Sequence, residues 1–471
     1  MKRFFLIPLI SFLLFSVLIA EPSLEGFLQN DLELKNLALE VKKSVLANKN
    51  VSIENGVDIT LSTGTANFRF NGDDSSISFN PSAKISVPQI NNLSVSGSSK
   101  IKLDNGSNNS SDISVSLSVD LISGAMTERK IALLKSEREV LIAKRNLQNR
   151  ALEAEKEYYA KLKSLFSAAS EISVAQNNLY DDTVDFDEIK AKGYSSSSAR
   201  YRQAELKVLS DNHEVETKIH ELEHDCAVFA SECGSLFESG TNPSDFLPKE
   251  IPQIESVDIL SFQKKFYTKI EEAEYKHKIA AMERDSEKNF SLAATAGYTF
   301  KNSNTSFSDN DSKSDTVDVG ISANYKGFTF GAGVYLPIDG ESPTYSASAS
   351  VNPNSFRSSK IKKQTDSMNE EQEVIAIQSA ENDYDTDIVD KQTELDDIKW
   401  SKETNLKTYE MYVNLADDMQ HLLKQGIVKE TEYLDAFANK ELYRFKLLIN
   451  DIDIIIYNNE TKLLFCRDDE L

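Results

Sequence analysis

The segment HELEH, which runs from His220 to His224, has the residue types and the spacing of a zinc site. Two histidines four positions apart lie on one face of a helix and can bind one zinc ion, with Glu221 between them as the general base. However, Glu223 places a charge where zinc proteases bury an apolar residue, and no histidine follows at metzincin spacing. A structural metal site that includes Cys226 is the other interpretation. We expect an exposed helix face, with no metal, no cofactor and no enzymatic activity.

The other reactive candidates are three cysteines, Cys226, Cys233 and Cys466. If the first two share a helix, their separation of seven residues is ~10 Å, which is too long for a disulfide. We interpret the three as buried or unreactive thiols. The sequence also has no phosphate-binding glycine loop and no nucleophile elbow, so nothing else in it indicates catalysis.

Two glycines interrupt long stretches that otherwise have the pattern of helices. Gly426 lies in QGIVKETEYLDAF and Gly193 lies in KGYSSSSARYRQA, and the two glycines are 233 residues apart. A glycine can end an incoming helix in the left-handed conformation, and a threonine such as Thr431 can cap the helix that follows. The sequence therefore predicts two helical hairpins, with tips near 193 and 426.

The other glycines and prolines predict where these hairpins begin and end. Seventeen of the 27 Gly and Pro residues fall between 56 and 124 or between 297 and 353, and five more lie in the segment 234–253. Ala125–Lys192 and Asn354–Gln425 contain neither residue type, so each can form one helix, ~100 Å and ~108 Å long at 1.5 Å per residue. Two return arms of 40 and 45 residues, which also contain no Gly or Pro, follow the two tips.

The long arms have the pattern of coiled-coil helices. In the first arm, apolar residues recur at steps of seven with one step of eleven: Leu134, Leu141, Leu152, Tyr159 and Phe166. Mixing these steps relaxes the left-handed supercoil locally. A stripe this narrow packs one helix against neighbours and does not build a wide core. A further breaker-free segment, Gln253–Ala296, is expected to add helix before the second group of strands.

Between the arms, apolar and polar residues alternate, as in DISVSLSVDL from Asp112 to Leu121. This period of two is typical of strands with one apolar and one polar face. We predict four strands in each of two blocks. They are Val57–Phe70, Ser75–Val87, Asn92–Leu103 and Ser111–Leu121, and then Phe290–Phe300, Thr316–Tyr325, Phe328–Leu336 and Thr344–Asn352.

The same order of elements occurs twice: helix, strand block, long helix, glycine break, return helix. The strand blocks begin near Gly56 and Phe290, 234 residues apart, which agrees with the spacing of the glycine breaks. Two features at one period indicate an internal duplication. The predicted segments are a signal peptide at 1–20, a first repeat at 21–253 with strand block 56–124 and linker 234–253, and a second repeat at 254–471 with strand block 290–353.

The first twenty residues indicate where the chain is sent, and the net charge indicates which partners it does not bind. Lys2 and Arg3 precede the apolar run Phe4–Ile19, which is typical of a secretory signal peptide, with an uncleaved anchor as the alternative. No later stretch approaches the ~18 apolar residues that a spanning helix needs. The 75 acidic and 52 basic residues give a net charge of −23, which argues against binding to nucleic acid.

Together these features resemble the TolC family of outer-membrane efflux ducts, along nearly the whole chain. The hairpin tips of that family have the pattern Gly-Leu-x-x-x-Thr/Ser-Asp/Glu-x-Leu. The second tip matches it at Gly426, Thr431, Glu432 and Leu434. The first tip matches it at Gly193, Tyr194 and Ser198, but Ala199 stands where an acid is usual.

The resemblance implies an α+β membrane protein that assembles as a homotrimer, with a shared β-barrel in the outer membrane and a coiled-coil α-helical tunnel in the periplasm. It implies a passive exit duct of an efflux or type I secretion system. Its partners would be outer-membrane lipid, a periplasmic adaptor protein and an inner-membrane transporter. Family members usually have two strands per half, whereas four are predicted here. A trimer would then have 24 strands, in a wider barrel or with an extracellular extension.

The resemblance also implies a role for two acids of the second tip, Glu432 and Asp435. They are three residues apart and therefore share a helical face. Acids at the matching positions of the family line the constriction of the periplasmic mouth. Three copies would form rings of negative charge that favour cations. Ordinary solvated carboxylates are the alternative.

Two other classes of protein share parts of this pattern. A periplasmic adaptor also combines helical hairpins with β-domains, but usually has one hairpin between split β-halves and an inner-membrane or lipid anchor. A secreted coiled-coil structural protein needs no strands with an apolar face. Two hairpins at one spacing and strands suited to a membrane favour the duct.

Overall fold

The structure, a computed structural model, describes residues 23–71, 74–104, 109–237, 243–287, 290–304, 312–338, 340 and 342–467. The predicted signal peptide and part of the predicted linker lie outside these residues. The chain divides into two compact units, which are described separately. One consists of Met1–Ala38, Arg145–Phe266 and Tyr384–Glu470, and the other of Leu39–Lys144 and Tyr267–Asp383, together with Leu471. The first is called the hairpin unit below and the second the sheet unit.

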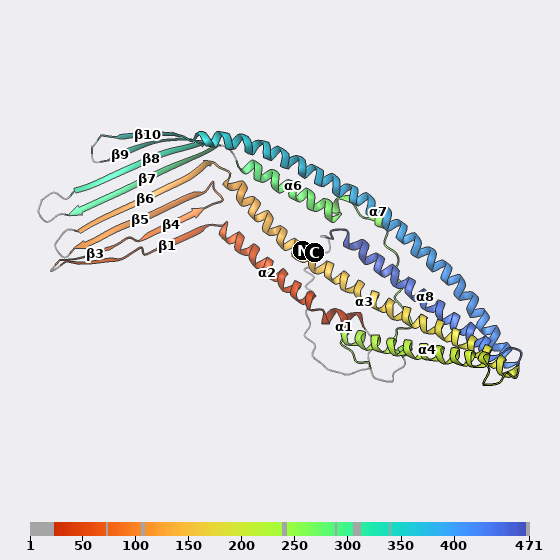
Figure 1. The fold of residues 1–471 in the computed structure, drawn as a ribbon. Helices are drawn as coiled ribbons and strands as arrows, with labels where there is room; N and C mark the ends of the chain where they lie inside the picture. Colours follow the sequence, from red (N-terminus) through yellow and green to blue (C-terminus); the bar gives the residue numbers. More distant parts are fainter. Residues whose placement is uncertain are drawn as a thin grey trace, which may run out of the picture. The chain divides into compact units, whose positions relative to one another are not determined.

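The breaker-free segments form the longest helices (Figure 1). They are α3 (Ala125–Ala191) and α7 (Pro353–Lys424), of 67 and 72 residues, and the two return helices α4 (Ala199–Glu232) and α8 (Glu430–Leu463), of 34 residues each. The two long arms are thus confirmed to within a residue or two. No helix among the described residues has an 18-residue stretch apolar enough to cross a bilayer.

Shorter helices complete the helical part of the chain. They are α1 (Leu24–Asn30), α2 (Leu32–Glu54), α5 (Pro243–Phe246), α6 (Thr268–Ser286) and the 3-10 turns Ile259–Ser261 and Lys264–Phe266. The prediction of helix from Gln253 onward is wrong for its first part. There the Val257 N–H donates to Asn458 Oδ1 (2.8 Å), and Asn458 Nδ2 donates to the Glu255 carbonyl (2.9 Å), so side chains satisfy backbone groups that a helix would bond internally.

The strands form one sheet in which every pair is antiparallel. They are β1 (Asp58–Ser62), β2 (Asn67–Asn71), β3 (Asp74–Phe79), β4 (Ser82–Val87), β5 (Leu93–Asp104), β6 (Asn109–Ile122), β7 (Phe290–Asn304), β8 (Ser312–Tyr325), β9 (Phe328–Pro337) and β10 (Thr344–Val351). The two predicted strands before β5 are each interrupted. Pro81 lies between β3 and β4 and has no N–H to give to the ladder. The hairpin therefore breaks into β1 with β4 and β2 with β3.

The two strand blocks join into this single sheet, in the order β1-β4-β5-β6-β7-β8-β9-β10, with β3 also beside β5. The junction is the pairing of β6 with β7, which runs from Asn109 opposite Asn304 to Ile122 opposite Leu292. The sheet thus has eight strand positions, as the sequence predicts. In the described part of the chain, β1 pairs only with β4 and β10 only with β9, so both edges of the sheet are open.

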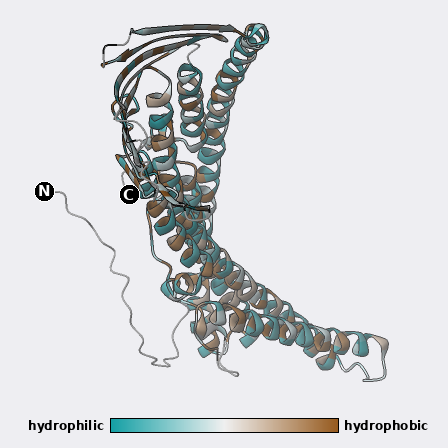
Figure 2. Ribbon diagram, turned by 90° about the vertical axis from the view of Figure 1, so that its left-hand side faces the viewer, coloured by the Kyte–Doolittle hydropathy of each residue, from teal (hydrophilic) through white to brown (hydrophobic). Residues whose placement is uncertain are grey.

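The two faces of the sheet differ in chemistry. On one face, serine hydroxyls hydrogen-bond in rows across β5 and β6: Ser94 with Ser118 (2.7 Å), Ser96 with Ser116 (2.6 Å) and Ser98 with Ser114 (2.7 Å). The opposite face carries large apolar side chains that remain exposed. They include Ile59, Leu61, Phe68, Val115, Leu117, Val319, Ile321 and Phe330. Figure 2 shows hydrophilic and hydrophobic residues interspersed along the strands and helices.

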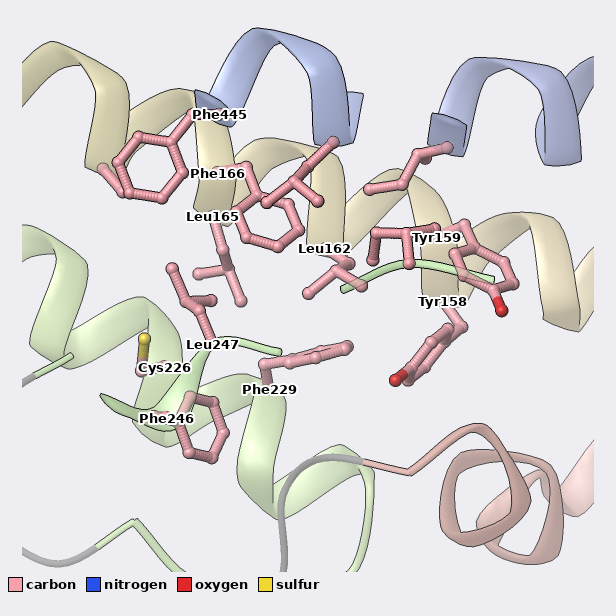
Figure 3. Close-up of a cluster of buried hydrophobic side chains, with 14 of the residues drawn as sticks. Tyr158, Tyr159, Leu162, Leu165, Phe166, Cys226, Phe229, Phe246, Leu247 and Phe445 are labelled. Carbon is pink, nitrogen blue, oxygen red and sulfur yellow. The ribbon is translucent and has the colours of Figure 1, made fainter. Parts of the chain in front are cut away.

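The main core lies in the hairpin unit, where α3, α4, α8 and the segment around α5 meet. Its members are Tyr158, Tyr159, Leu162, Leu165, Phe166, Ala169, Leu222, Cys226, Phe229, Ala230, Cys233, Phe246, Leu247, Ile251, Phe445, Leu448, Ile452 and Ile455. The rings of Phe166 and Phe445 lie 6.0 Å apart, and Figure 3 shows them among these side chains. Tyr159 and Phe166, which belong to the predicted stripe of α3, are both buried here.

Charged side chains hold α6 between α3 and α7 in the sheet unit. Arg138 of α3 contacts Glu271 through two nitrogens, with a distance of 2.6 Å from Nη2 to Oε2. On the other side, Arg284 donates to both oxygens of Glu373 of α7, at 2.6 and 2.8 Å. These bonds from Arg284, followed by the contact with His277, lower the pKa of Glu373 to about 2. The attraction within such partly buried pairs is largely offset by the cost of removing the charges from water.

Candidate functional site

The first hairpin tip is a glycine-ended helix followed by a capped one. Gly193 has φ +75°, its N–H donates to the Lys190 carbonyl (3.0 Å), and the Tyr194 N–H donates to the Ile189 carbonyl (3.4 Å). This is the bonding pattern of a Schellman motif, which requires a left-handed residue. Ser198 then caps α4, because its Oγ accepts from the Tyr201 N–H at 3.3 Å. The predicted break at Gly193 is confirmed.

At the second tip the incoming helix ends as it does at the first tip, but the outgoing helix begins differently. Gly426 has φ +70°, its N–H donates to the Leu423 carbonyl (2.9 Å), and the Ile427 N–H donates to the Leu422 carbonyl (3.0 Å). The prediction that Thr431 caps the outgoing helix is wrong. Helix α8 begins at Glu430, two residues earlier than a cap at Thr431 would place it, with Lys429 as its N-cap residue and no side-chain cap. Glu430 and Glu432 in the first turn compensate for the missing side-chain cap, because carboxylates stabilise the positive end of a helix dipole.

The two tips lie close to one another within the hairpin unit. The charge of Lys429 beside the second tip lowers the pKa of Glu188, although the hydrogen bond from Lys192 is the larger cause. Burial, and then the charge of Asp181 on α3, raise the pKa of Asp435 on α8 against an opposing hydrogen bond from Asn439. The tips therefore share one electrostatic environment.

The predicted tip residues take different positions at this end of the unit. Glu432 is exposed and Asp435 is half-buried, so they do not present equal charges to solvent. Tyr194 is exposed and accepts a hydrogen bond from Arg200 at 3.3 Å. Leu434 is half-buried, and Oγ1 of Thr431 is buried without a hydrogen-bond partner in the described part of the chain.

The structure adds a group that sequence reasoning missed, the carboxyl pair Asp182 and Asp211 with Lys207. Asp182 is buried on α3, and Lys207 and Asp211 reach it from α4. The hydrogen bond that the protonated Asp211 carboxyl donates to Asp182, and then burial, raise the pKa of Asp211 to about 6. Burial raises the pKa of Asp182, but the bonds from Asp211 and Lys207 outweigh it, so this pKa is lowered. The signal in the sequence is weak, because residues 25 and 29 positions apart meet only once the hairpin is folded.

This pair predicts that the end of the first hairpin loses stability as pH rises from 5 to 7.5. Folding raises the pKa of Asp211 to about 6, so its stabilising contribution is complete below the unfolded value of about 4 and is lost as pH rises through the folded value. The lowered pKa of Asp182 acts only below this range. Amide hydrogen exchange around Asp182 and Asp211, corrected for its intrinsic pH dependence, is expected to show less protection at pH 7.5.

The Asp211→Asn variant is the control for this prediction. An amide keeps the hydrogen bond to Asp182 and does not titrate, so its protection is expected to be equal at pH 5 and pH 7.5. Wild-type protection that is the same at both pH values would contradict the assignment of the proton to this pair.

The two histidines of the zinc-like segment lie on an exposed face of α4. His220 is 79% exposed on α4, and its Nδ1 lies 3.3 Å from Glu223 of the same helix face. Among the residues that the structure describes, no group of three or more His, Cys, Asp or Glu side chains is placed to hold a metal ion. The three cysteines are buried, as predicted, and burial raises the pKa of Cys226 and Cys233 to about 12.

Comparison with known families accounts for both halves of the chain. Residues 24–251 match the family model described as the TP096X N-terminal domain, and residues 252–468 match the one described as the TP096X C-terminal domain. The chain belongs to the TP096X family. No curated protein matches the sequence of this TP096X chain significantly.

Solved structures resemble this TP096X fold over most of its length. The open state of the MtrE outer-membrane channel of Neisseria gonorrhoeae is 12% identical, with a TM-score of 0.50 over 94% of this chain and 87% of MtrE. The outer-membrane channel OprN is 12% identical, with a TM-score of 0.49 over 94% of this chain and 89% of OprN. The outer-membrane protein VceC of Vibrio cholerae is 12% identical, with a TM-score of 0.44 over 93% of this chain and 93% of VceC. The likeness to MtrE shows that the TP096X chain has the α+β fold of an outer-membrane channel. The resemblance to the TolC family is thereby confirmed for the fold.

Proposed function

We propose that this TP096X chain is one protomer of a homotrimeric outer-membrane channel, the passive exit duct of an efflux or type I secretion system. The observation that carries this proposal is the sheet, which exposes apolar side chains on one face, serine rows on the other and two open edges. Lipid excludes unpaired strand edges, so such a sheet must close with further strands. A barrel places the apolar face against lipid and the hydroxyl face toward water.

The proposal assigns the helices to the periplasm. Both hairpin tips would then form the periplasmic mouth and the docking surface for an adaptor protein, which connects the duct to an inner-membrane transporter. The residues proposed for this mouth are Gly193, Tyr194, Ser198, Gly426, Thr431, Glu432, Leu434 and Asp435. Energy for transport would come from the transporter, since a duct of this kind has no chemistry of its own.

The proposal also retains the two-repeat organisation. The first repeat covers 21–253 and the second 254–471, each with its own strand block and hairpin. The similar glycine-ended tips support it, since Gly193 and Gly426 have nearly the same φ and the same bonding pattern. A periplasmic adaptor is disfavoured, because a soluble β-domain does not leave a whole sheet face of large apolar residues exposed.

The tip acids give the proposal a direct test. The double variant Glu432→Ala with Asp435→Ala is expected to lower the preference of the channel for cations severalfold and to weaken block by divalent cations. The reason is that rings of carboxylates concentrate cations at a constriction. Conductance and reversal potential of the purified protein in planar bilayers measure both effects.

The matched control for the tip acids is Glu216→Ala, which removes an exposed carboxylate from α4 away from the tip. This variant is expected to keep the cation preference of the wild type. If the double variant and the control have the same selectivity, the tip acids do not line the constriction. If no variant or wild-type preparation conducts, the channel proposal itself fails.

A further inference from the structure

The apolar face of the sheet ends in aromatic side chains where the strands meet the helices. Phe290 begins β7, Tyr325 ends β8 and Phe328 begins β9, and they are 38%, 48% and 45% exposed. Phe290 pairs with Tyr325, and Tyr325 with Phe328, so the three are neighbours on one face. The ring of Phe328 also lies 5.0 Å from the ring of Phe356, at the beginning of α7. This end of the apolar face is therefore next to the first turn of α7.

Basic residues gather at the same place, although the whole chain has a net charge of −23. The segment 355–363, in the first turns of α7, contains four basic residues and no acid. Lys326 lies in the turn between β8 and β9, and its Nζ is 5.3 Å from the centre of the Tyr325 ring. A cation is attracted to the face of an aromatic ring at this distance. Positive charge therefore lies beside the aromatic end of the apolar face.

A pocket of about 780 Å³ joins the turn at Lys326 to the first turns of α7, and we call it the basic pocket. Three serines of α7 line it and supply hydroxyl donors. Its charged lining residues are Arg284, Lys326, Lys362 and Lys363, with the acids Glu287 and Asp366. The basic side chains outnumber the acidic ones, and cations combined with hydroxyl groups are the donors that phosphate oxygens accept from.

Two of the four cations of the basic pocket already have carboxylate partners. Arg284 donates to both oxygens of a glutamate of α7, and Lys362 contacts Glu287. Lys326 and Lys363 differ from them, because neither has a carboxylate partner among the residues that the structure describes. These two ammonium groups are therefore the ones that an anionic ligand can neutralise.

We propose that the basic pocket binds the phosphate of an anionic phospholipid, such as phosphatidylglycerol, in the periplasmic leaflet of the outer membrane. This inference rests on the proposed function, which places the apolar face of the sheet against lipid and the helices in the periplasm. The aromatic end of that face then lies at the boundary between acyl chains and headgroups, where aromatic side chains of membrane proteins gather. Lys326 and Lys363 lie beside this boundary, at the level of the phosphates.

A lipid headgroup fits the surroundings of the basic pocket better than a soluble anion does. The exposed rings of Tyr325 and Phe328 continue onto the apolar strands β8 and β9, so the acyl chains of a lipid held by its phosphate can lie along them. A soluble anion would use the cations and leave these rings in water. Each lysine or arginine near an anionic lipid surface adds about fivefold to the affinity.

Lipid binding to the full chain in detergent tests this inference. Native mass spectrometry measures the affinity for short-chain phosphatidylglycerol and for phosphatidylcholine of the same chain length. We expect the wild type to prefer phosphatidylglycerol. The double variant Lys326→Gln with Lys363→Gln is expected to bind phosphatidylglycerol about twentyfold more weakly and phosphatidylcholine as before, because two cations are lost.

Two further variants separate the pocket from general effects of charge and folding. Lys42→Gln with Lys43→Gln removes the same charge from exposed positions of α2, fifteen or more residues before β1, and is expected to keep the preference for phosphatidylglycerol. Lys326→Arg with Lys363→Arg keeps both charges in the pocket and is also expected to keep it. Loss of the preference in the control pair, or none in the glutamine pair, overturns the assignment to this pocket.

The remaining outcomes distinguish the ligand and separate this inference from the channel proposal. Equal affinity of the wild type for the two lipids overturns the inference, and so does inorganic phosphate that binds as tightly as phosphatidylglycerol, since the pocket would then hold a soluble anion. Conductance in planar bilayers of phosphatidylcholine tests the channel separately. A protein that conducts there without any lipid preference leaves the channel intact and overturns the basic pocket as a lipid site.

Discussion

Replacing Phe166 by alanine is expected to destabilise the hairpin unit by about 3–5 kcal/mol, the usual cost of removing a buried phenylalanine ring. Phe166 is fully buried at the centre of the core that joins α3, α4 and α8, and its ring lies against Phe445. The helices around it are long and narrow, so few neighbouring side chains can move into the space that the ring leaves. Urea unfolding, followed by the hydrogen exchange of α3, α4 and α8, measures the loss.

Val174→Ala on the same helix is the matched control for Phe166→Ala. Val174 is 43% exposed, and substitutions at such positions usually change stability by less than about 0.5 kcal/mol. The two variants are expected to differ by several kcal/mol. If they unfold at the same urea concentration, the cluster around Phe166 does not hold the three helices together.

The second large effect is expected on the sheet, where two neighbouring residues point to opposite faces. Leu117→Arg places a charge on the apolar face, in the middle of the register between Val95 of β5 and Ala296 of β7. In a lipid-facing position near the bilayer midplane this costs about 2–4 kcal/mol. Ser116→Arg places the same charge on the hydroxyl face, where water would solvate it. Leu117→Arg is therefore expected to block assembly in the outer membrane, and Ser116→Arg to be tolerated.

Recovery from the outer-membrane fraction and heat-modified mobility on gels compare the two arginine variants. Both residues are exposed within one chain, so a difference between them cannot come from packing inside the protomer. Equal recovery of the two variants would mean that neither face of the sheet meets lipid. That result would remove the main support of the channel proposal.

Much of the fold follows from where the sequence has no glycine or proline. Uninterrupted segments predict α3 and α7 closely, because nothing in them breaks a helix. The strand positions follow from alternation, since a period of two allows only an extended chain with unlike faces. The break around Pro81 could not be predicted in the same way. It depends on which residues pair across the strands, and the pattern of a single strand does not contain that information.

The tips could be predicted only in part. Gly193 and Gly426 end their helices as expected, because the left-handed conformation requires glycine there. The beginning of α8 could not be predicted from Thr431, since the acids at Glu430 and Glu432 stabilise an earlier start without any side-chain cap. The pairing of Asp182 with Asp211 depends on the register of α3 against α4, which is set by packing along the whole hairpin.

The pairing of β6 with β7 has a consequence for the biogenesis of the protein. Its residues nearest in sequence, Ile122 and Leu292, are 170 positions apart, so the ribosome makes a complete helical hairpin between the two strands. Until β7 emerges, β6 exposes an apolar face and an unpaired edge, which is the state most prone to aggregation. Long-range strand pairing is also slow. The segment β5–β6 is therefore the part of the unfinished chain that is most exposed to wrong strand pairing.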